Sequence, residues 1–447
     1  MSKAAVILAA GQGTRMKSAL PKVLHKVAGL PLLGHVVAAL KGAGVDHIVV
    51  VTSAAGEEVR AYAKALGAQS AIQHQQLGTG HAAASAAEAL KDFSGTLLIV
   101  NGDMPLVTSD TIAECLSAQA RTGLALLAFN AADPASYGRV LLGPDGFLDR
   151  IVEYKDASES ERSVTLCNAG CYAADARKFF RWAGALKNDN AQKEYYLTDV
   201  PAQARAEGVA CAIAVTDEVS VSGVNSRAEL AQAEEKFQAR FRARLLKDGV
   251  TMTAPETVFF TNDTVVENDV EIEPFVVFGP GVTIRSGARL RSYSHLEGAT
   301  VARGAIVGPF ARLRPGALIG EDAHIGNFVE VKNTVIEKGA KANHLTYLGD
   351  AKVGAGANIG AGTITCNYDG FTKSTTEIGA GAFIGSDTAL VAPVKIGDGA
   401  ITAAGSVITK DVAADALALA RSVQVEKPGW AKAFRDRQRT KRQAEKK

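Results

Sequence analysis

The sequence lacks a strong charge of either sign and any long apolar run near its start. Its 49 Lys and Arg residues nearly balance 47 Asp and Glu residues, which leaves a net charge of +2. This balance argues against a protein that coats nucleic acid, and a hydrophobic content of 47% argues against a disordered chain. The opening apolar run, Ala4 to Ala10, is too short for a membrane span and leads into a glycine-rich loop instead of a signal-peptide cleavage site. We therefore expect no nucleic-acid partner, no membrane span and no secretion.

Cysteine is also scarce. The five cysteines are scattered and odd in number, and no second pair accompanies Cys167 and Cys171 to complete a zinc site. This pattern argues against a disulfide framework, so we expect reduced, buried thiols in a cytoplasmic protein. The cysteines are Cys115, Cys167, Cys171, Cys211 and Cys366.

Aromatic residues make up only 6% of the chain, whereas glycine is unusually common. Glycine accounts for 44 of 447 residues, against roughly 7% in average proteins. The surplus predicts tight turns that recur around small side chains. At roughly 150 residues per domain, a chain of this length should hold two or three domains.

The first half of the chain alternates short aliphatic runs with helical patterns. The runs lie near Val6, at His47 to Thr52, at Thr96 to Val100 and at Leu124 to Phe129. Apolar strands separated by amphipathic helices predict a mostly parallel sheet that helices cover on both faces. The segment Ser226 to Lys247 is rich in Ala, Glu, Arg and Leu, and it predicts one exposed helix that joins two units.

After Gly249 the sequence adopts a period of six residues. Neither a helix nor an ordinary strand repeats at this spacing, which is typical of a parallel β-helix. The periodic positions are Val258, Val270, Val276 and Val282 with Thr264 between them, then Val301, Val307, Leu313, Ile319, Ile325 and Val331, and finally Ile378, Ile384, Leu390, Ile396 and Ile408 with Thr402 in the missing place.

A polar insertion, Cys366 to Glu377, interrupts this period. It predicts a loop on one face of the β-helix, either a binding loop or a tolerated surface loop. We accordingly divide the chain into an α/β domain at residues 1–227, a helical linker at 228–248, and a β-helix domain with a basic tail at 249–447.

The stretch from Leu8 to Lys22 follows the first predicted strand and carries a glycine-rich loop. Gly11 and Gly13 allow the backbone to approach a ligand, and the N–H groups of such a loop bind phosphate oxygens. Arg15 and Lys22 add the positive charge that a transferring phosphoryl group needs. The loop is neither the dinucleotide-binding fingerprint, because the third glycine is missing, nor a P-loop, because its G-K-[ST] ending is missing.

Taken whole, this stretch resembles the L-x-x-G-x-G-T-x-M-x-x-x-x-P-K signature of the sugar-nucleotide pyrophosphorylases, which join a sugar 1-phosphate to a nucleoside triphosphate. Together with the hexapeptide half, the chain from Met1 to Arg421 resembles the bifunctional family that combines an N-acetylglucosamine-1-phosphate uridyltransferase with a glucosamine-1-phosphate N-acetyltransferase. The resemblance implies a Rossmann-like nucleotidyltransferase domain, a helical linker and a left-handed parallel β-helix, assembled as a homotrimer. It also implies four small-molecule substrates, namely UTP, glucosamine 1-phosphate, N-acetylglucosamine 1-phosphate and acetyl-CoA.

The resemblance assigns roles to residues of the first half. Lys22 would hold the nucleotide phosphates, Arg15 would stabilise charge in the transition state, and Gln73 would read the uracil edge, to which an amide offers both a donor and an acceptor. The substrate-binding positions of this half would be Leu8, Ala9, Ala10, Gly11, Lys22, Gln73, Gly78, Thr79, Asn101, Gly102, Asp103, Gly138, Glu153, Asn168 and Asn225.

A magnesium site is implied at Asp103. This residue follows an apolar strand, at the edge where ligands bind in open α/β sheets, and a carboxylate there can hold Mg²⁺. An isolated Asp in this place is more often a turn residue or a cap, but the resemblance pairs Asp103 with Asn225 as a second metal ligand. Asn101 departs from the aromatic residue that the family pattern leads us to expect.

In the β-helix, the informative residues are those that break the aliphatic rule. Arg314 and Lys332 are 18 residues apart and should stack on successive coils, which predicts an anion site for the sugar phosphate or, alternatively, stacked surface charges. The resemblance makes His344 the general base for the attacking amine, with Glu330 able to orient its ring. The remaining substrate-binding positions would be Tyr347 and Asn358, and acetyl-CoA would contact Ala361, Asn367, Tyr368, Ser386, Ala404 and Arg421.

The C-terminal tail is strongly basic. Residues 427–447 hold nine Lys or Arg and two Asp or Glu, a local charge of +7, so the rest of the chain carries 2 − 7 = −5. We expect a solvated or disordered tail, although such a run also suits an anionic surface.

The sequence thus predicts a two-step enzyme that feeds cell-envelope precursors. It would acetylate glucosamine 1-phosphate in the β-helix half and then convert the product to UDP-N-acetylglucosamine in the α/β half, with Mg²⁺ and UTP. A second hypothesis is a single-activity pyrophosphorylase whose β-helix is only a scaffold.

Overall fold

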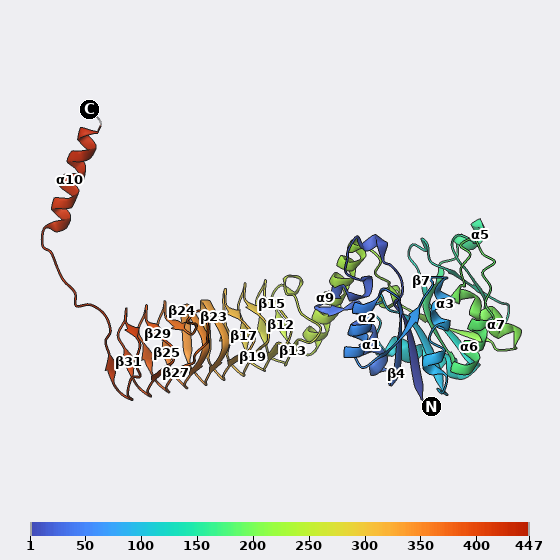
Figure 1. The fold of residues 1–447 in the computed structure, drawn as a ribbon, viewed down its shortest axis with the longest axis horizontal. Helices are drawn as coiled ribbons and strands as arrows, with labels where there is room; N and C mark the ends of the chain where they lie inside the picture. The colour runs from blue at the N-terminus through green and yellow to red at the C-terminus, as the bar shows by residue number, and fades with distance from the viewer. Residues whose placement is uncertain (1, 446–447) are drawn as a thin grey trace. The chain divides into compact units, whose positions relative to one another are not determined.

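The computed structural model describes residues 2–445, which form two compact units (Figure 1). Of the described residues, the first unit comprises 2–244 and 260–262, and the second comprises 245–259 and 263–445. Each unit is described by itself below. No helix among the described residues combines the length and the apolar character that crossing a bilayer requires.

The first unit is built on one sheet with the strand order β11-β7-β10-β6-β1-β4-β5. The four predicted aliphatic runs are confirmed as β1, β4, β6 and β7, which all run in the same direction. Strand β10, which no predicted run covers, runs antiparallel between β6 and β7 and pairs at its side with the hairpin β8–β9. The strands are β1 (Lys3–Leu8), β4 (His47–Ser53), β5 (Gln69–Gln73), β6 (Thr96–Asn101), β7 (Leu124–Asn130), β8 (Arg139–Leu142), β9 (Leu148–Val152), β10 (Leu166–Asp175) and β11 (Cys211–Thr216).

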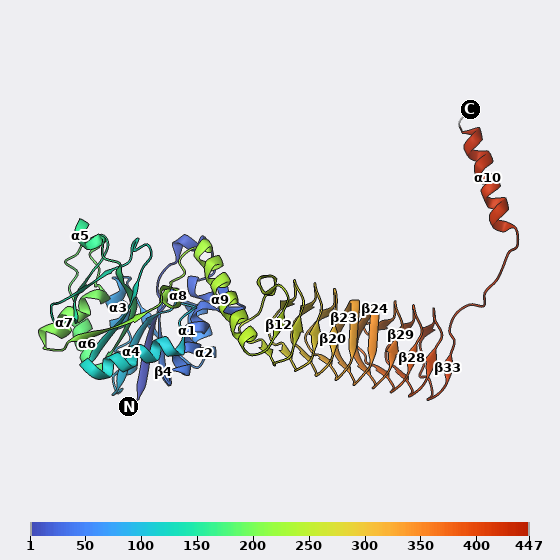
Figure 2. The same ribbon diagram turned by 180° about the vertical axis from the view of Figure 1, so that it is seen from behind.

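Helices cover both faces of this sheet, as the apolar runs predict. One buried cluster packs α1, α2 and α4 on one face, and a second packs α3, α6 and α7 on the other. Figure 2 shows α4 lying along its face of the sheet. The helices are α1 (Leu32–Gly42), α2 (Glu57–Ala65), α3 (Thr79–Ala84), α4 (Ser109–Thr122), α5 (Glu159–Arg162), α6 (Ala176–Gly184), α7 (Val200–Ala206) and α8 (Glu218–Val221).

The linker segment forms the predicted helix, α9 (Arg227–Lys247), but its first part is not an exposed rod. Phe237 and Phe241 are buried, with the Phe237 ring 5.5 Å from the ring of His35. Arg240 donates to the Leu106 carbonyl oxygen at 2.9 Å. This part of α9 therefore packs on the α/β unit, because its sparse apolar residues recur at helical spacing.

The second unit is a parallel β-helix in which short strands, from β12 (Thr251–Met252) to β33 (Leu417–Ala418), pair with strands one coil away. Figures 1 and 2 show these coils stacked along one axis. Strands β23 and β24 are longer than the others and pair with each other along their length. These two strands and their neighbours carry the residues discussed below. The strands concerned are β21 (Arg312–Leu313), β23 (His324–Ile336), β24 (Lys341–Val353), β25 (Asn358–Ile359) and β26 (Ile364–Cys366).

The sequence periodicity is confirmed, and each hexapeptide proves to bury two side chains. All the periodic positions named above are buried, from Val258 to Ile408. These positions belong to two different places in the hexapeptide. From Val301 on, they are the large aliphatic position, and a small buried residue such as Ala299 or Ala305 stands two residues before it. Val258 to Val282 instead occupy that small-residue position. A large and a small inward residue together fill the narrow prism.

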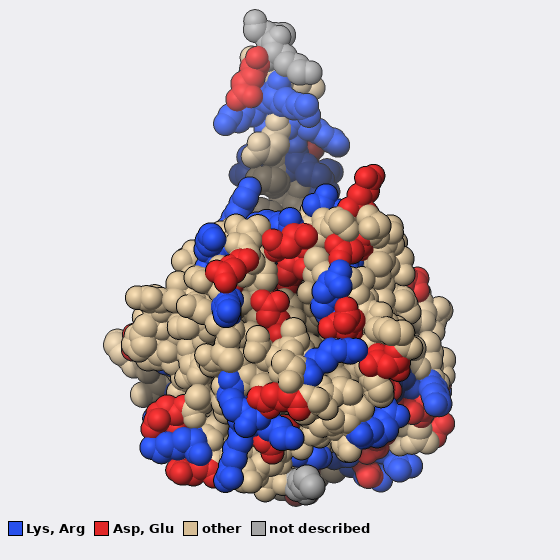
Figure 3. All heavy atoms as spheres, turned by 90° about the vertical axis from the view of Figure 1, so that its right-hand side faces the viewer, with Lys and Arg blue, Asp and Glu red and all other residues tan. Residues whose placement is uncertain are grey.

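The basic tail contains a helix, α10 (Trp430–Ala444), with no buried residue. Of the two alternatives expected for the tail, solvated or disordered, this exposed helix corresponds to the solvated one. Lys446 and Lys447 of the predicted tail lie outside the described residues. Figure 3 shows Lys and Arg intermixed with Asp and Glu on the visible face of the α/β unit, whereas the tail is mostly basic.

Two candidate active sites

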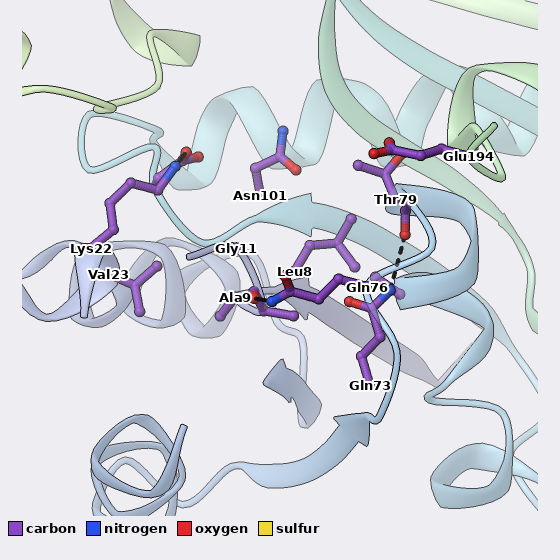
Figure 4. A pocket seen from close by; sticks show the side chains of 14 residues that line it. Leu8, Ala9, Gly11, Lys22, Val23, Gln73, Gln76, Thr79, Asn101 and Glu194 are labelled. Atoms are coloured by element: carbon purple, nitrogen blue, oxygen red, sulfur yellow. Dashed lines mark hydrogen bonds and ion pairs between the residues drawn. The ribbon is translucent and has the colours of Figure 1, made fainter. Parts of the chain in front are cut away.

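A cavity of about 330 Å³ opens at the carboxyl ends of the parallel strands in the α/β unit. Figure 4 shows side chains from the ends of β1, β5 and β6 converging on it. It gathers most of the residues expected at the nucleotide, namely Leu8, Ala9, Ala10, Gly11, Lys22, Gln73, Gly78, Thr79, Asn101 and Asp103.

The glycine-rich loop folds back closely on Lys22. Gly13 has a φ of 60°, and a Cβ atom there would lie 2.7 Å from the Lys22 Cβ. Only glycine fits both the left-handed backbone and this approach. The loop therefore delivers the Lys22 side chain to the cavity.

Lys22 joins the two expected metal ligands. Its Nζ atom lies 2.5 Å from Asp103 Oδ2 and 3.0 Å from Asn225 Oδ1, and the side chains of the ion pair are 15% and 16% exposed. Asn225 is held in turn by its backbone N–H, which donates to Glu229 Oε2 at 2.6 Å. Two oxygen donors from distant segments thus converge on one cation.

A second cavity, of about 280 Å³, adjoins the first. Thr79, Asn101 and Asp103 line both cavities. The second cavity contains the three residues expected at the sugar, Gly138, Glu153 and Asn168, and it also reaches Asn225. Nucleotide and sugar residues therefore meet at Asp103.

Glu153 and Asn168 occupy different electrostatic environments. Burial raises the pKa of the Glu153 carboxyl, and the Thr198 hydroxyl, which donates to Oε1 at 3.2 Å, partly offsets this shift. Asn168 donates to the Tyr172 hydroxyl at 3.1 Å and accepts from the Gly170 N–H at 2.8 Å, beside an irregularity in β10. Asn168 is thus oriented in the absence of a sugar. The charged form of the half-buried Glu153 carboxyl is disfavoured by desolvation.

Some expected residues lie elsewhere, and others were missed. Gly102 donates its N–H to the Leu8 carbonyl at 2.9 Å and so joins β1 to β6, and Arg15 lines an adjacent hollow that also includes Asn225. Gln76 and Glu194 line the nucleotide cavity, and Gln76 donates to the Ala10 carbonyl at 2.7 Å. Gln76 stands in the motif that contains Gln73, but nothing in the sequence distinguishes Glu194.

In the β-helix, His344 is paired with a residue that the sequence analysis did not single out. Asn327 on β23 stands opposite His344 on β24, and Asn327 Oδ1 lies 2.9 Å from His344 Nδ1. An amide oxygen only accepts, so Nδ1 carries the proton in this contact. In the neutral imidazole Nε2 is then unprotonated and has a free lone pair. Glu330, expected to orient the ring, instead accepts a hydrogen bond from Arg314 at 2.8 Å and forms a longer ion pair with Arg312 at 3.7 Å.

Three cationic side chains gather near the expected sugar-phosphate position. The nearby Lys373 ammonium lowers the pKa of Lys332, and desolvation and the Arg314 charge lower it further. Lys373 belongs to the insertion that interrupts the hexapeptide period, and it pairs there with Tyr368 in an isolated bridge. In the same region Asn367, which is buried, donates to Asp350. The inserted loop thus supplies a cation that the sequence reading missed.

Four of the six residues expected at acetyl-CoA follow one corner of the prism, whereas Asn367 and Tyr368 lie in the inserted loop. Gly362, Asp387 and Gly405 donate their backbone N–H groups to Leu345, Ala361 and Ser386, at 3.1, 2.7 and 2.8 Å respectively. Successive coils therefore stack His344, Ala361, Ser386 and Ala404 near the same corner. Arg421 reaches this corner too and donates to the Ala404 carbonyl at 2.9 Å. Asn358 and Tyr347 lie on β25 and β24 nearby.

Comparisons with known proteins cover both halves. Residues 5–168 match the MobA-like NTP transferase domain, and residues 375–410 match the bacterial transferase hexapeptide (six repeats). The chain is 60% identical to a bifunctional protein GlmU of Maricaulis maris over 434 residues, which are 97% of this chain and 96% of the relative. It is 53% identical to proteins of the same name from Cereibacter sphaeroides and Ruegeria sp., over 99% of this chain in each case.

These matches extend through the β-helix as well as the α/β unit, so they do not favour a β-helix that is only a scaffold. The described residues contain no cluster of three or more His, Cys, Asp or Glu side chains able to hold a metal. By the identity and coverage of these relatives, the chain belongs to the family of bifunctional GlmU proteins.

Proposed function

We propose that this bifunctional transferase catalyses two consecutive steps at the two sites described above. The β-helix site moves the acetyl group of acetyl-CoA to the amine of glucosamine 1-phosphate. The α/β site then joins the resulting N-acetylglucosamine 1-phosphate to the uridylyl group of UTP and releases pyrophosphate. The observation that carries this proposal is the junction at Asp103, where a nucleotide cavity and a sugar cavity meet beside the Lys22 ammonium.

Uridylyl transfer needs positioning and charge neutralisation more than a covalent nucleophile. A phosphate oxygen of the sugar phosphate attacks the α-phosphorus of UTP, and the bond from that phosphorus to the pyrophosphate oxygen breaks. Lys22 lies at the meeting point of the two cavities, where its ammonium can neutralise the phosphates. Glu153 and Asn168 hold the sugar so that its phosphate points toward Lys22.

The donor set at this junction suits Mg²⁺. Asp103 Oδ2 and Asn225 Oδ1 are oxygen ligands that already converge on one cation, the Lys22 ammonium, and Mg²⁺ prefers a few such oxygens together with substrate phosphates. When bound, the ion would neutralise charge on the phosphate oxygens. Asp103 and Asn225 would hold it, while Lys22 would turn to the phosphates.

Acetyl transfer uses the lone pair on His344 Nε2. That nitrogen takes a proton from the amine of glucosamine 1-phosphate as the amine nitrogen attacks the thioester carbonyl. The carbon–sulfur bond then breaks, and the departing thiolate takes the proton from His344 Nε2, so that coenzyme A leaves as its thiol. Arg314, Lys332 and Lys373 neutralise the sugar phosphate, and the corner from Ala361 to Ala404 with Arg421 takes acetyl-CoA.

We propose a homotrimer, because the β-helix carries an unpartnered apolar surface. Four aromatic side chains stack along the corner that continues to His344, with ring centroids 4.9 to 5.3 Å apart. Each is about half exposed, and neighbouring copies would cover them. These residues are Phe275, Tyr293, Phe310 and Phe328.

We also propose that the protein acts in the cytoplasm, because its free thiols suit reducing conditions.

One pair of variants tests the two-site function. His344→Ala should abolish the release of coenzyme A from acetyl-CoA and glucosamine 1-phosphate, while uridylyl transfer continues. Asp103→Ala should do the reverse, as followed by pyrophosphate release. A folded wild-type protein that makes UDP-N-acetylglucosamine but releases no coenzyme A would refute the bifunctional proposal.

A further inference from the structure

Both N–H groups of the Gln73 side-chain amide have acceptors within the protein. Gln73 ends strand β5 and is only 4% exposed. Its Nε2 atom lies 3.1 Å from the Gly78 carbonyl oxygen and 3.1 Å from Nδ1 of His81. Figure 4 shows the Gln73 side chain at the cavity with its bond to the Gly78 segment drawn.

These two contacts determine which end of the amide faces the cavity. A backbone carbonyl can only accept, so the amide nitrogen and not the amide oxygen must lie against Gly78. Both N–H groups of the Gln73 amide then donate hydrogen bonds, one to the Gly78 carbonyl oxygen and one to His81 Nδ1, which must be the acceptor. The amide oxygen is left as the free group of a residue that lines the nucleotide cavity.

The surrounding backbone makes this arrangement stiff. Gly78 has a φ of 103°, and a Cβ atom there would lie 2.7 Å from the Tyr195 carbonyl oxygen. Gly80 donates to that same oxygen at 2.8 Å, and Thr79 Oγ1 accepts from the Leu197 N–H at 3.1 Å. The start of helix α3, and with it His81, is therefore fixed to the segment around Tyr195.

We propose that His81 is a specificity-determining positioning residue, which holds the Gln73 amide so that only an acceptor faces the base. This inference rests on the proposed use of UTP. Uracil carries a hydrogen on N3 and can donate to the Gln73 oxygen, whereas N3 of cytosine is an acceptor and meets it lone pair to lone pair. Without the His81 contact only the Gly78 carbonyl holds the amide nitrogen, so the amide turns more readily and offers an N–H group to cytosine.

Steady-state uridylyl and cytidylyl transfer from UTP and CTP would test this role in the full chain. His81→Phe keeps a ring beside Tyr195 but removes the acceptor, and His81→Asn places an amide oxygen close to where Nδ1 stood. His74→Phe is the matched control, because His74 is an exposed histidine of the same segment. Acetyl transfer by the same preparations reports that each variant is folded.

We expect His81→Phe to lower the ratio of kcat/KM for UTP to that for CTP by about tenfold or more, while His81→Asn and His74→Phe stay near the wild-type ratio. An unchanged ratio in His81→Phe, including a parallel loss with both nucleotides, would overturn the inference. So would a ratio in His81→Asn that falls as far as in His81→Phe. A wild-type protein that does not use UTP at all would instead refute the proposed function.

Discussion

The ammonium of Lys22 lies 2.5 Å from the carboxylate of Asp103, across 81 positions of sequence. Asn225 completes the contact from a third segment, 3.0 Å away. The glycine-rich loop, the end of β6 and the segment before α9 are thereby joined at one point. A protein cation thus stands between the two oxygens that we propose as metal ligands.

Replacing Lys22 should separate phosphate binding from metal binding. Lys22→Gln removes the ammonium that neutralises the phosphates, so we expect uridylyl transfer to fall by about 100-fold or more. Binding of Mn²⁺ without nucleotide, followed by water-proton relaxation, should become tighter because no ammonium competes for Asp103 and Asn225. Lys17→Gln serves as a control on the same loop. Weaker Mn²⁺ binding in Lys22→Gln would contradict the competition.

Glu153 should cost stability at neutral pH. Because burial raises its pKa in the folded protein, the folded state holds a proton that the unfolded state, with a pKa of about 4.3, releases earlier. Wild-type stability is therefore lost as the pH rises from the unfolded value through the raised folded value. Glu153→Gln keeps an oxygen for Thr198 but never ionises, so its first melting transition at pH 7.5 should lie higher, by about 2 °C.

This gain should shrink as the pH is lowered toward 4.5, while uridylyl transfer is impaired because the sugar loses a charged acceptor. Thermal melts at several pH values would measure the size and the sign of the difference in melting temperature between Glu153→Gln and the wild type. The exposed Glu159 provides the matched control, Glu159→Gln. A gain that grows toward acid pH would contradict the assignment.

Asn327, and not Glu330, should orient His344. Asn327→Ala leaves Nδ1 without its acceptor, so we expect kcat for acetyl transfer to fall about 10-fold to 100-fold, with uridylyl transfer unchanged. Asn327→Asp restores an acceptor and should recover most of the rate. Glu330→Gln should chiefly raise KM for glucosamine 1-phosphate, because Glu330 holds Arg314. A fall in kcat for Glu330→Gln equal to that for Asn327→Ala would return the orienting role to Glu330.

Lys373 should contribute to binding of the sugar phosphate. Lys373→Gln removes one of three clustered cations, and we expect KM for glucosamine 1-phosphate to rise about tenfold, with a smaller dependence on salt. Since Lys373 lowers the pKa of Lys332, the loss of affinity at alkaline pH should also move to higher pH in the variant. Lys338→Gln, at an exposed lysine paired with Glu321, is the control. An unchanged KM would exclude Lys373 from the phosphate site.

Local pattern predicted much of the architecture. The aliphatic runs of the first half form strands because they are buried on both faces of a sheet, and the hexapeptide period forms a β-helix because each flat side of the prism buries the same places. The antiparallel course of β10 escaped prediction, since a strand's direction depends on its partners in the sheet. The packing of Phe237 and Phe241 was missed for a similar reason, because the surface that covers them lies outside α9.

The sequence by itself determined the class of each half, the position of the glycine-rich loop, and the residue types available for chemistry, because these depend on local spacing. Tertiary structure alone decided which of those residues meet. The paired strands β23 and β24 place residues 17 apart opposite each other, which sets Asn327 against His344 and leaves Glu330 with Arg314. The inserted loop brings Lys373 to Lys332, and the sheet edge brings Lys22 to Asp103, because coil length and strand order, not sequence distance, determine these contacts.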